Sequence, residues 1–167
     1  TRPDLFPTYI TDELQSLQDN LPTEISFEQI QDIFLSEFDN TIDDYFDSFE
    51  IEPIASASIS QVHRGRLKNG KKVAVKFLKP NIDIFFANDI AFLNGFVSIL
   101  SWFNNKRIKD ILMIISECSN SIEQEIDLLN EKRNIIVFSK LFGDQIHIPR
   151  VYSKLTSSKV LTMQYMS

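Results

Sequence analysis

Residues 54–80 read IASASISQVHRGRLKNGKKVAVKFLKP, and this stretch decides the fold. After a run of small residues come two segments separated by Asn69-Gly70, and in the second one every other residue is Val or Phe. That alternation is the period-two pattern of a half-buried strand. Asn69-Gly70 lies between the segments and predicts a type I′ turn, because both residues tolerate a positive φ. The stretch therefore predicts a β-hairpin that pairs residues 60–67 with residues 72–78.

Lys76 lies inside the second strand, on the same face as Ala74. A lysine there is unfavourable unless its ammonium has an anionic partner or its stem reaches solvent. The tetrapeptide VAVK, residues 73–76, is typical of the kinase strand whose lysine binds nucleotide phosphates and is held by a helix glutamate. The tetrapeptide alone is not specific, since a lysine that snorkels from an edge strand gives the same pattern.

The loop before the hairpin contains no glycine. Ordinary kinases place a glycine-rich loop over the phosphates at this point. Here Ala55, Ser56, Ala57 and Ser58 stand in its place, and the sequence QVH follows at residues 61–63. An alanine-serine loop has fewer ways to wrap phosphates than a glycine-rich one, so ordinary protein-kinase activity is not expected.

The combined sequence PIASASISQVHRGRLKNGKKVAVK resembles the alanine-rich loop and lysine strand of the UbiB-like, or aarF-domain, atypical kinases. The resemblance runs from about Arg2 to Met166 and implies an α+β, protein-kinase-like fold. The expected architecture is an amino-terminal lobe with a five-stranded antiparallel sheet and long helices at residues 51–167, preceded by a helical extension at residues 1–50. The resemblance also implies ATP or ADP with Mg²⁺ as cofactor, and a link to coenzyme Q, other isoprenoid quinones or lipids.

Three carboxylates follow in the segment EIDLLNE at residues 125–131. On a continuous helix Asp127 and Glu131 share a face, while Glu125 points about 120° away from Glu131. From the residues alone this is either a solvated acidic face or the partner of Lys76. The segment resembles the family's ExD motif and the helix glutamate beyond it. The resemblance implies that Glu131 orients Lys76, as the two catalytic residues, and that Glu125 and Asp127 face the metal region or a KxGQ segment upstream of Thr1.

The resemblance implies further nucleotide contacts. Residues 55–58 would lie over the phosphates, and Ala74 would line the adenine pocket. The apolar segments at 146–152 and 159–165 read as strands and resemble the last strands of the lobe. Met163 would then be the gatekeeper-like position. The hinge would consist of Gln164, Tyr165 and Met166.

The remaining segments read as helices. Apolar spacing predicts helices at 8–19, after Ser26 and at 108–142, and a short one opens at Thr41. Ser26 and Thr41 each have a partner for a capping box three residues on, Gln29 and Asp44. Residues 83–103 are very apolar and read as an inserted helix. Its longest charge-free run is shorter than the roughly 20 residues that span a membrane, so it predicts a buried or partner-facing helix, with contact at a membrane surface as the alternative.

Composition excludes several classes of site and partner. A net charge of −6 over 167 residues argues against a general nucleic-acid binder. The single cysteine, Cys118, excludes an internal disulfide framework. The two histidines, His63 and His147, have no metal-ligand spacing, so no metal ligand is assigned within these residues.

The chain contains no HRD-like catalytic loop and no DFG-like metal aspartate, which phosphoryl transfer requires. We therefore expect the second lobe to lie outside this sequence. The main hypothesis is the ATP-binding lobe of an atypical kinase or ATPase. The alternatives are a non-catalytic pseudokinase scaffold, a small-molecule phosphotransferase of kinase-like fold, which the alanine-serine loop disfavours, and a helical adaptor, which leaves Lys76 unexplained. Expected partners are quinone- or lipid-synthesis proteins, or a membrane through residues 84–103. The expected location is the mitochondrion, the plastid or the periphery of the bacterial inner membrane.

Overall fold

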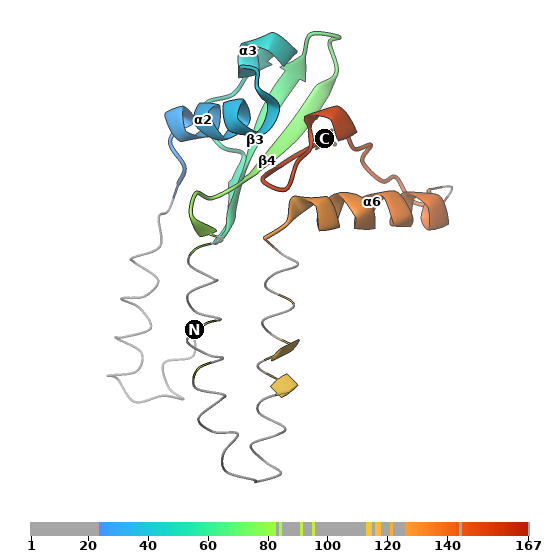
Figure 1. The fold of residues 1–167 in the computed structure, drawn as a ribbon. Helices are drawn as coiled ribbons and strands as arrows, with labels where there is room; N and C mark the ends of the chain where they lie inside the picture. The colour runs from blue at the N-terminus through green and yellow to red at the C-terminus, as the bar shows by residue number, and fades with distance from the viewer. Residues whose placement is uncertain are drawn as a thin grey trace, which may run out of the picture.

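The computed structural model describes residues 24–82, 126–143 and 145–166, together with residues 84, 91, 95, 113, 114, 116, 117 and 121. Over these residues the chain has an α+β fold built on one antiparallel sheet (Figure 1). Its elements are α2 (Phe27–Phe38), α3 (Ile42–Tyr45), β1 (Phe46–Phe49), β2 (Ala55–Ser56), β3 (Ser60–Leu67), β4 (Lys72–Leu78), α6 (Leu128–Phe142), a 3₁₀ turn (Ser153–Leu155) and β5 (Val160–Gln164).

The five strands form one sheet in the order β1-β3-β4-β5, and β2 also pairs with β3. β1 pairs with the far end of β3, near Leu67, whereas β2 pairs with its near end, at Gln61 and Val62. β4 is the central strand and lies between β3 and β5. The five-stranded antiparallel sheet predicted from the sequence is confirmed.

The predicted hairpin is present with the predicted strand limits, Ser60–Leu67 and Lys72–Leu78. The predicted type I′ turn is wrong. Of the two residues expected in the turn, only Gly70 has a positive φ, of 81°, and its amide donates to Leu67 O at 2.8 Å. The Asn69 side chain instead accepts from the Lys71 amide at 3.1 Å. The loop is therefore longer than a two-residue turn and places its one left-handed residue at glycine, where the strain is smallest.

The central strand β4 is buried on both faces rather than half-buried. One face packs on α2 and α3 around Ile30, Phe34, Val75 and Phe77, which are all fully buried. The close approach of β1 to this face requires a glycine, because a Cβ on Gly65 would lie 2.7 Å from the Phe46 ring. This face of the sheet forms the main core.

The capping boxes predicted before α2 and α3 are both present. The short helix ends at Tyr45, and the next four residues form the edge strand β1. Phe46 and Phe49 pack in the main core from this strand. The capping box marked where the helix begins and gave no sign of how soon it ends.

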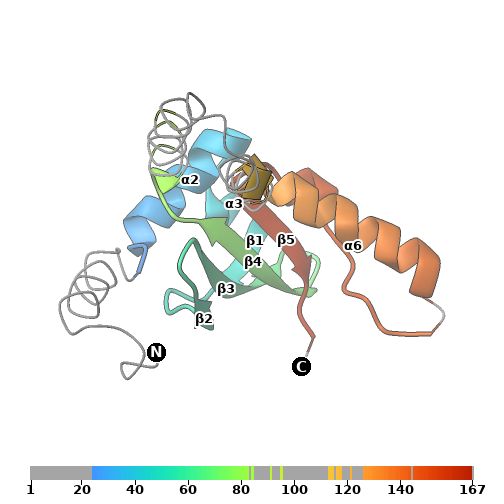
Figure 2. The same ribbon diagram turned by 90° about the horizontal axis from the view of Figure 1, so that it is seen from below.

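The other face of the sheet carries α6. Leu78, Leu128 and Leu161 form a small second core there, with Ile135 and Met163 packed against it. Figure 2 shows α6 next to β5, on the opposite side of the sheet from α2. This arrangement brings α6 to the face on which Lys76 lies.

Two predicted elements differ in the structure. The helix predicted at 108–142 is interrupted, because Asp127 has extended backbone angles and α6 begins only at Leu128. The strand predicted at 146–152 is reduced to one bridge between Val151 and Met163, next to Pro149 and the 3₁₀ turn. The helix at 8–19 and most of the apolar helix at 83–103 lie outside the described residues.

Candidate functional site

Lys76 and Glu131 meet on the α6 face of the sheet. Lys76 Nζ donates to Glu131 Oε2 at 2.6 Å, and the two side chains are 23% and 38% exposed. Across the sheet Lys76 lies opposite Val62 on β3 and Leu161 on β5, so its aliphatic stem runs between apolar neighbours. The sequence placed these two residues together although 55 positions separate them. An ion pair with this much solvent contact adds about 0–1 kcal/mol to stability.

The start of α6 fixes where Glu131 lies. Asp127 caps the helix by accepting from the Leu129 amide at 2.9 Å, and the Leu128 amide donates to Ser158 O at 2.9 Å. The Leu128 side chain is only 1% exposed and anchors this end in the second core. Glu131 follows one turn later, on the side that faces β4. Asp127 is therefore the cap of α6 and not part of the helix. It does not share a helical face with Glu131, although the two would share one in a continuous helix.

A cleft of about 580 Å³ opens between α6 and the alanine-serine loop. Its described lining comprises Ala57, Ile59, Ser60, Lys76, Ser121, Asp127, Asn130, Glu131 and Asn134. The residues predicted from the loop, the lysine strand and the acidic segment thus meet in one cavity. Glu125 lies outside the described residues.

The loop reaches the cleft at one predicted position. Ala57 lines the cavity, and its amide donates to Ser60 O at 2.8 Å, so that amide is not available to a ligand. Ala55 and Ser56 form β2 and pair with Val62 and Gln61 of β3. Ser58, the remaining position, is exposed.

The predicted base-binding residues lie further along the same face. Ala74 pairs directly with Met163 across β4 and β5, and both are largely buried. The Gln164 and Tyr165 amides donate to Arg150 O and Lys72 O, so neither is free for a ligand. Met166, the last predicted hinge residue, is 46% exposed.

Arg64 adds a contact at the Tyr165 end of this face that the sequence did not reveal. It lies opposite Ala74, its guanidinium lies 4.6 Å from the centre of the Tyr165 ring, and it donates to the Tyr165 hydroxyl at 3.0 Å. It also pairs with Glu50 at 3.3 Å.

Three polar residues of the cleft were also missed by the sequence analysis: Ser121, Asn130 and Asn134. Asn130 and Asn134 flank Glu131 at helical spacing, which places them on neighbouring positions of one helix side. That spacing was the available signal, but asparagines on a helix are too common to single out without the cleft.

The chemistry of the cleft partly suits a nucleotide. An ammonium has three N–H donors, and the bond to Glu131 uses one of those on Lys76. The described lining also carries two carboxylates, Asp127 and Glu131, so a polyphosphate there needs a divalent cation to offset them. Within the described part of the chain no cluster of three His, Cys, Asp or Glu side chains could hold a metal by itself.

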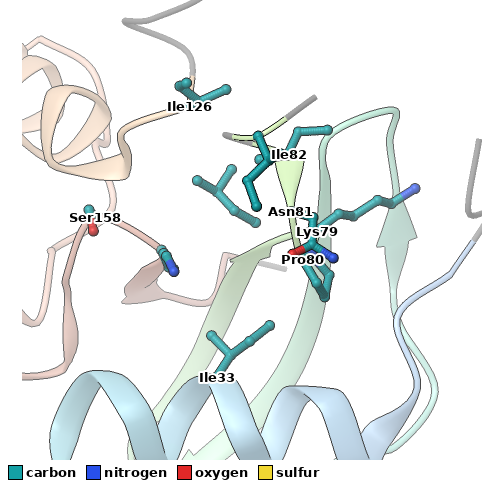
Figure 3. Close-up of a pocket in the computed structure, with 10 residues that line it drawn as sticks. Ile33, Lys79, Pro80, Asn81, Ile82, Ile126 and Ser158 are labelled. Carbon is teal, nitrogen blue, oxygen red and sulfur yellow. The ribbon is translucent and has the colours of Figure 1, made fainter. Parts of the chain in front are cut away.

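A second cavity, of about 460 Å³, lies near the end of β4 (Figure 3). Ile33 of α2, Ile82 and Ile126 line it from three separate parts of the chain. Its described lining shares no residue with the Lys76 cleft. Among the described residues no helix is long and apolar enough to cross a membrane.

Comparison with known proteins assigns the family. The ABC1 atypical kinase-like domain matches residues 16–167. The chain is 37% identical over 171 residues to a probable protein kinase UbiB of Cellvibrio japonicus, covering 98% of this chain and 30% of that protein. It is 36% identical over 174 residues to an uncharacterized chloroplastic aarF domain-containing protein kinase of Arabidopsis thaliana, covering 99% of this chain and 24% of that protein.

A solved structure supports the same fold. The Rv3197–erythromycin complex from Mycobacterium tuberculosis matches with a TM-score of 0.71 and 24% identity, covering 98% of this chain and 41% of that one. The chain spans less than half the length of these relatives, which are bacterial or chloroplastic proteins. The match to the domain family extends over most of the sequence, and the chain therefore belongs to the ABC1 atypical kinase-like family.

Proposed function

We propose that this chain is the ATP-binding lobe of an atypical kinase or ATPase, with Lys76 at the phosphates and Glu131 orienting it. The observation that carries the proposal is the 2.6 Å ion pair at the wall of a cleft that also reaches the alanine-serine loop. A lysine strand and a helix glutamate form this pair in kinases, where the lysine contacts the α- and β-phosphates.

Each part of the cleft has a role in this proposal. Residues 55–58 lie over the phosphates and keep bulk water from them. Ala74 and Met163 line the base-binding end, and backbone groups of residues 164–166 other than the engaged Gln164 and Tyr165 amides contact the base. A bound nucleotide with Mg²⁺ would supply the transferable phosphoryl group. In this proposal the metal ligands and the catalytic loop are supplied by other parts of the whole protein, as the catalytic-loop and DFG segments supply them in kinases.

A non-catalytic scaffold is the second candidate. The engaged Ala57 amide and the two carboxylates in the cleft favour it, because both reduce what the lobe offers to phosphates. Such a scaffold binds nucleotide, lipid or partner proteins and hydrolyses no ATP. Phosphate release by the purified full-length protein separates the two candidates.

We further propose a role in isoprenoid-quinone or lipid metabolism, since the chain is similar to a probable protein kinase UbiB. Synthesis proteins of such a pathway, or a membrane surface near residues 84–103, would be the partners. The mitochondrion, the plastid and the periphery of the bacterial inner membrane are the candidate locations, and the bacterial and chloroplastic relatives support the last two.

Nucleotide binding by the full-length protein with magnesium tests the central proposal. Lys76→Ala should lower the affinity for ADP and ATP by about tenfold to a hundredfold, which corresponds to the loss of one charge-assisted hydrogen bond. Lys72→Ala is the matched control, because Lys72 lies on the same strand, carries the same charge and is exposed. Equal affinity in the two variants would reduce the Lys76–Glu131 pair to a structural role. Absence of binding in the wild type would favour a scaffold that uses no nucleotide.

A further inference from the structure

Two buried polar side chains, Gln61 and His63, lie behind the alanine-serine loop. They are 1% and 0% exposed. They pair across the sheet with Phe77 and Val75, whose side chains lie in the main core. Both are therefore on the face opposite Lys76 and do not line the cleft. The motif QVH, which marks the family resemblance, has its first and last side chains in this position.

The Gln61 amide holds the backbone of Ile25. It accepts from Ile25 N at 2.8 Å and donates to Ile25 O at 3.1 Å. A neighbouring strand would bind the same residue through the same two groups. The chain just before α2 is thus fixed to β3, although 36 positions separate the two residues.

One arrangement of protons satisfies the whole network. His63 Nδ1 lies 2.9 Å from Glu50 O, and a carbonyl can only accept, so Nδ1 carries the proton. Gln61 Nε2 lies 2.9 Å from His63 Nε2, so the amide donates to the bare ring nitrogen. Both Gln61 N–H groups and its oxygen are then used, and His63 is neutral.

The surroundings favour this neutral form. The Phe49 ring stacks on His63 with centroids 5.5 Å apart, and Phe77 meets it edge-on at 6.0 Å. Burial among these rings lowers the pKa of His63, although the hydrogen bond to Glu50 and the charge of Glu52 act the other way. The network thus joins Ile25, Glu50 and β3 into one rigid unit.

That unit adjoins the loop. The backbone of Gln61 pairs with Ser56, and residues 57–60 lie between these two partners. We infer that Gln61 and His63 are positioning residues for the alanine-serine loop. They hold the loop over the cleft by fixing β3, the strand that follows it in the chain. The inference rests on the proposed nucleotide site only for its consequence, because the loop position itself can be measured without a ligand.

Amide hydrogen exchange in the full-length protein tests the inference. Gln61→Met keeps the volume and removes the bonds of Gln61 to Ile25 and to His63, while Ile30→Ala perturbs the same core from α2 and removes no group of the network. The amides of Ile54 and Ala57 report the loop, since they donate to Val62 O and Ser60 O. Under conditions that give the two variants the same free energy of unfolding, these two amides should exchange about tenfold faster in Gln61→Met than in Ile30→Ala. Affinity for ADP with magnesium should fall by about tenfold in the same comparison.

Equal exchange in the two variants would overturn the inference, because Gln61 would then act only on global stability. Faster loop exchange with unchanged ADP affinity would support the positioning role and overturn only its consequence for the ligand. If the wild type binds no ADP, the nucleotide proposal fails. The exchange comparison then still decides whether Gln61 positions the loop.

The wild-type protein and one isosteric variant provide a second measurement. The ¹⁵N shifts of His63 should identify the neutral ring with its proton on Nδ1. In Gln61→Glu the carboxylate can only accept, so Nε2 should become protonated and the pKa of His63 should rise. A wild-type proton on Nε2, or an unchanged pKa in the variant, would overturn the hydrogen-bond assignment and with it the inference.

Discussion

Shortening Glu131 by one methylene tests whether it orients Lys76 or only adds charge. Glu131→Asp keeps the carboxylate but withdraws it by about 1.5 Å, the length of one C–C bond. The separation from Lys76 Nζ, now 2.6 Å, then grows to about 4 Å. In water-like surroundings the Coulomb attraction falls from about 1.6 to about 1.0 kcal/mol. Because both side chains are partly exposed, the free energy of unfolding should change by less than about 1 kcal/mol.

The effect on nucleotide binding should be larger than the effect on stability. With its partner out of reach, Lys76 is free to leave the cleft, and affinity for ADP with magnesium should fall by about tenfold. Glu131→Gln separates the two contributions, because it keeps the length and removes a negative charge that repels phosphate. Calorimetric titration of both variants, with Glu28→Asp on α2 as the control, measures these affinities.

The two explanations predict opposite orders of affinity. If Glu131 orients Lys76, the wild type binds most tightly. If Glu131 contributes only charge, Glu131→Asp binds like the wild type and Glu131→Gln binds more tightly than either. The second order would refute the orienting role.

Other positions give independent tests. Gly65→Ala should lower the free energy of unfolding by about 1–3 kcal/mol, because its Cβ would press on the Phe46 ring, and an unchanged denaturation midpoint would contradict this packing. Asp127→Ala should cost about 0.5–2 kcal/mol through loss of the α6 cap, and circular dichroism during denaturation measures it. The lowered pKa of His63 means that the unfolded chain binds more protons below pH 6.5, so stability should fall as pH decreases from that value. This slope should persist in His147→Gln and disappear in His63→Gln, and its persistence in both would assign it to another group.

The sequence predicted the parts of the fold that depend on local pattern. Alternation over residues 73–78, read with the Asn69-Gly70 turn signal, led to the limits of β3 and β4, because a one-residue slip would move Val75 and Phe77 from the main core to the face of Lys76. The resemblance of the lysine strand and the acidic segment to the UbiB-like kinases implied the Lys76–Glu131 pair, which the structure contains.

Features that depend on tertiary contacts were not predicted. The apolar spacing of 108–142 continues through Asp127, where the chain leaves the helix because Leu128 docks on Ser158. β1 is a strand only because β3 lies beside it. The network of Gln61 and His63 depends on Ile25, which is 36 positions away from Gln61 in the sequence. No local sequence pattern predicts that contact.

The position of Lys76 relative to the phosphates is the central claim, and an acyl-phosphate derivative of ATP tests it most directly, since it transfers its label to a lysine beside the phosphates. Mass spectrometry of the labelled full-length protein reports each lysine separately, with the exposed Lys72 of the same strand as an internal reference. If Lys76 lies beside the phosphates, the derivative labels Lys76, excess ATP with magnesium prevents that labelling, and labelling of Lys72 is unaffected. Labelling of Lys76 that persists in saturating ATP would show that Lys76 does not lie beside the bound phosphates.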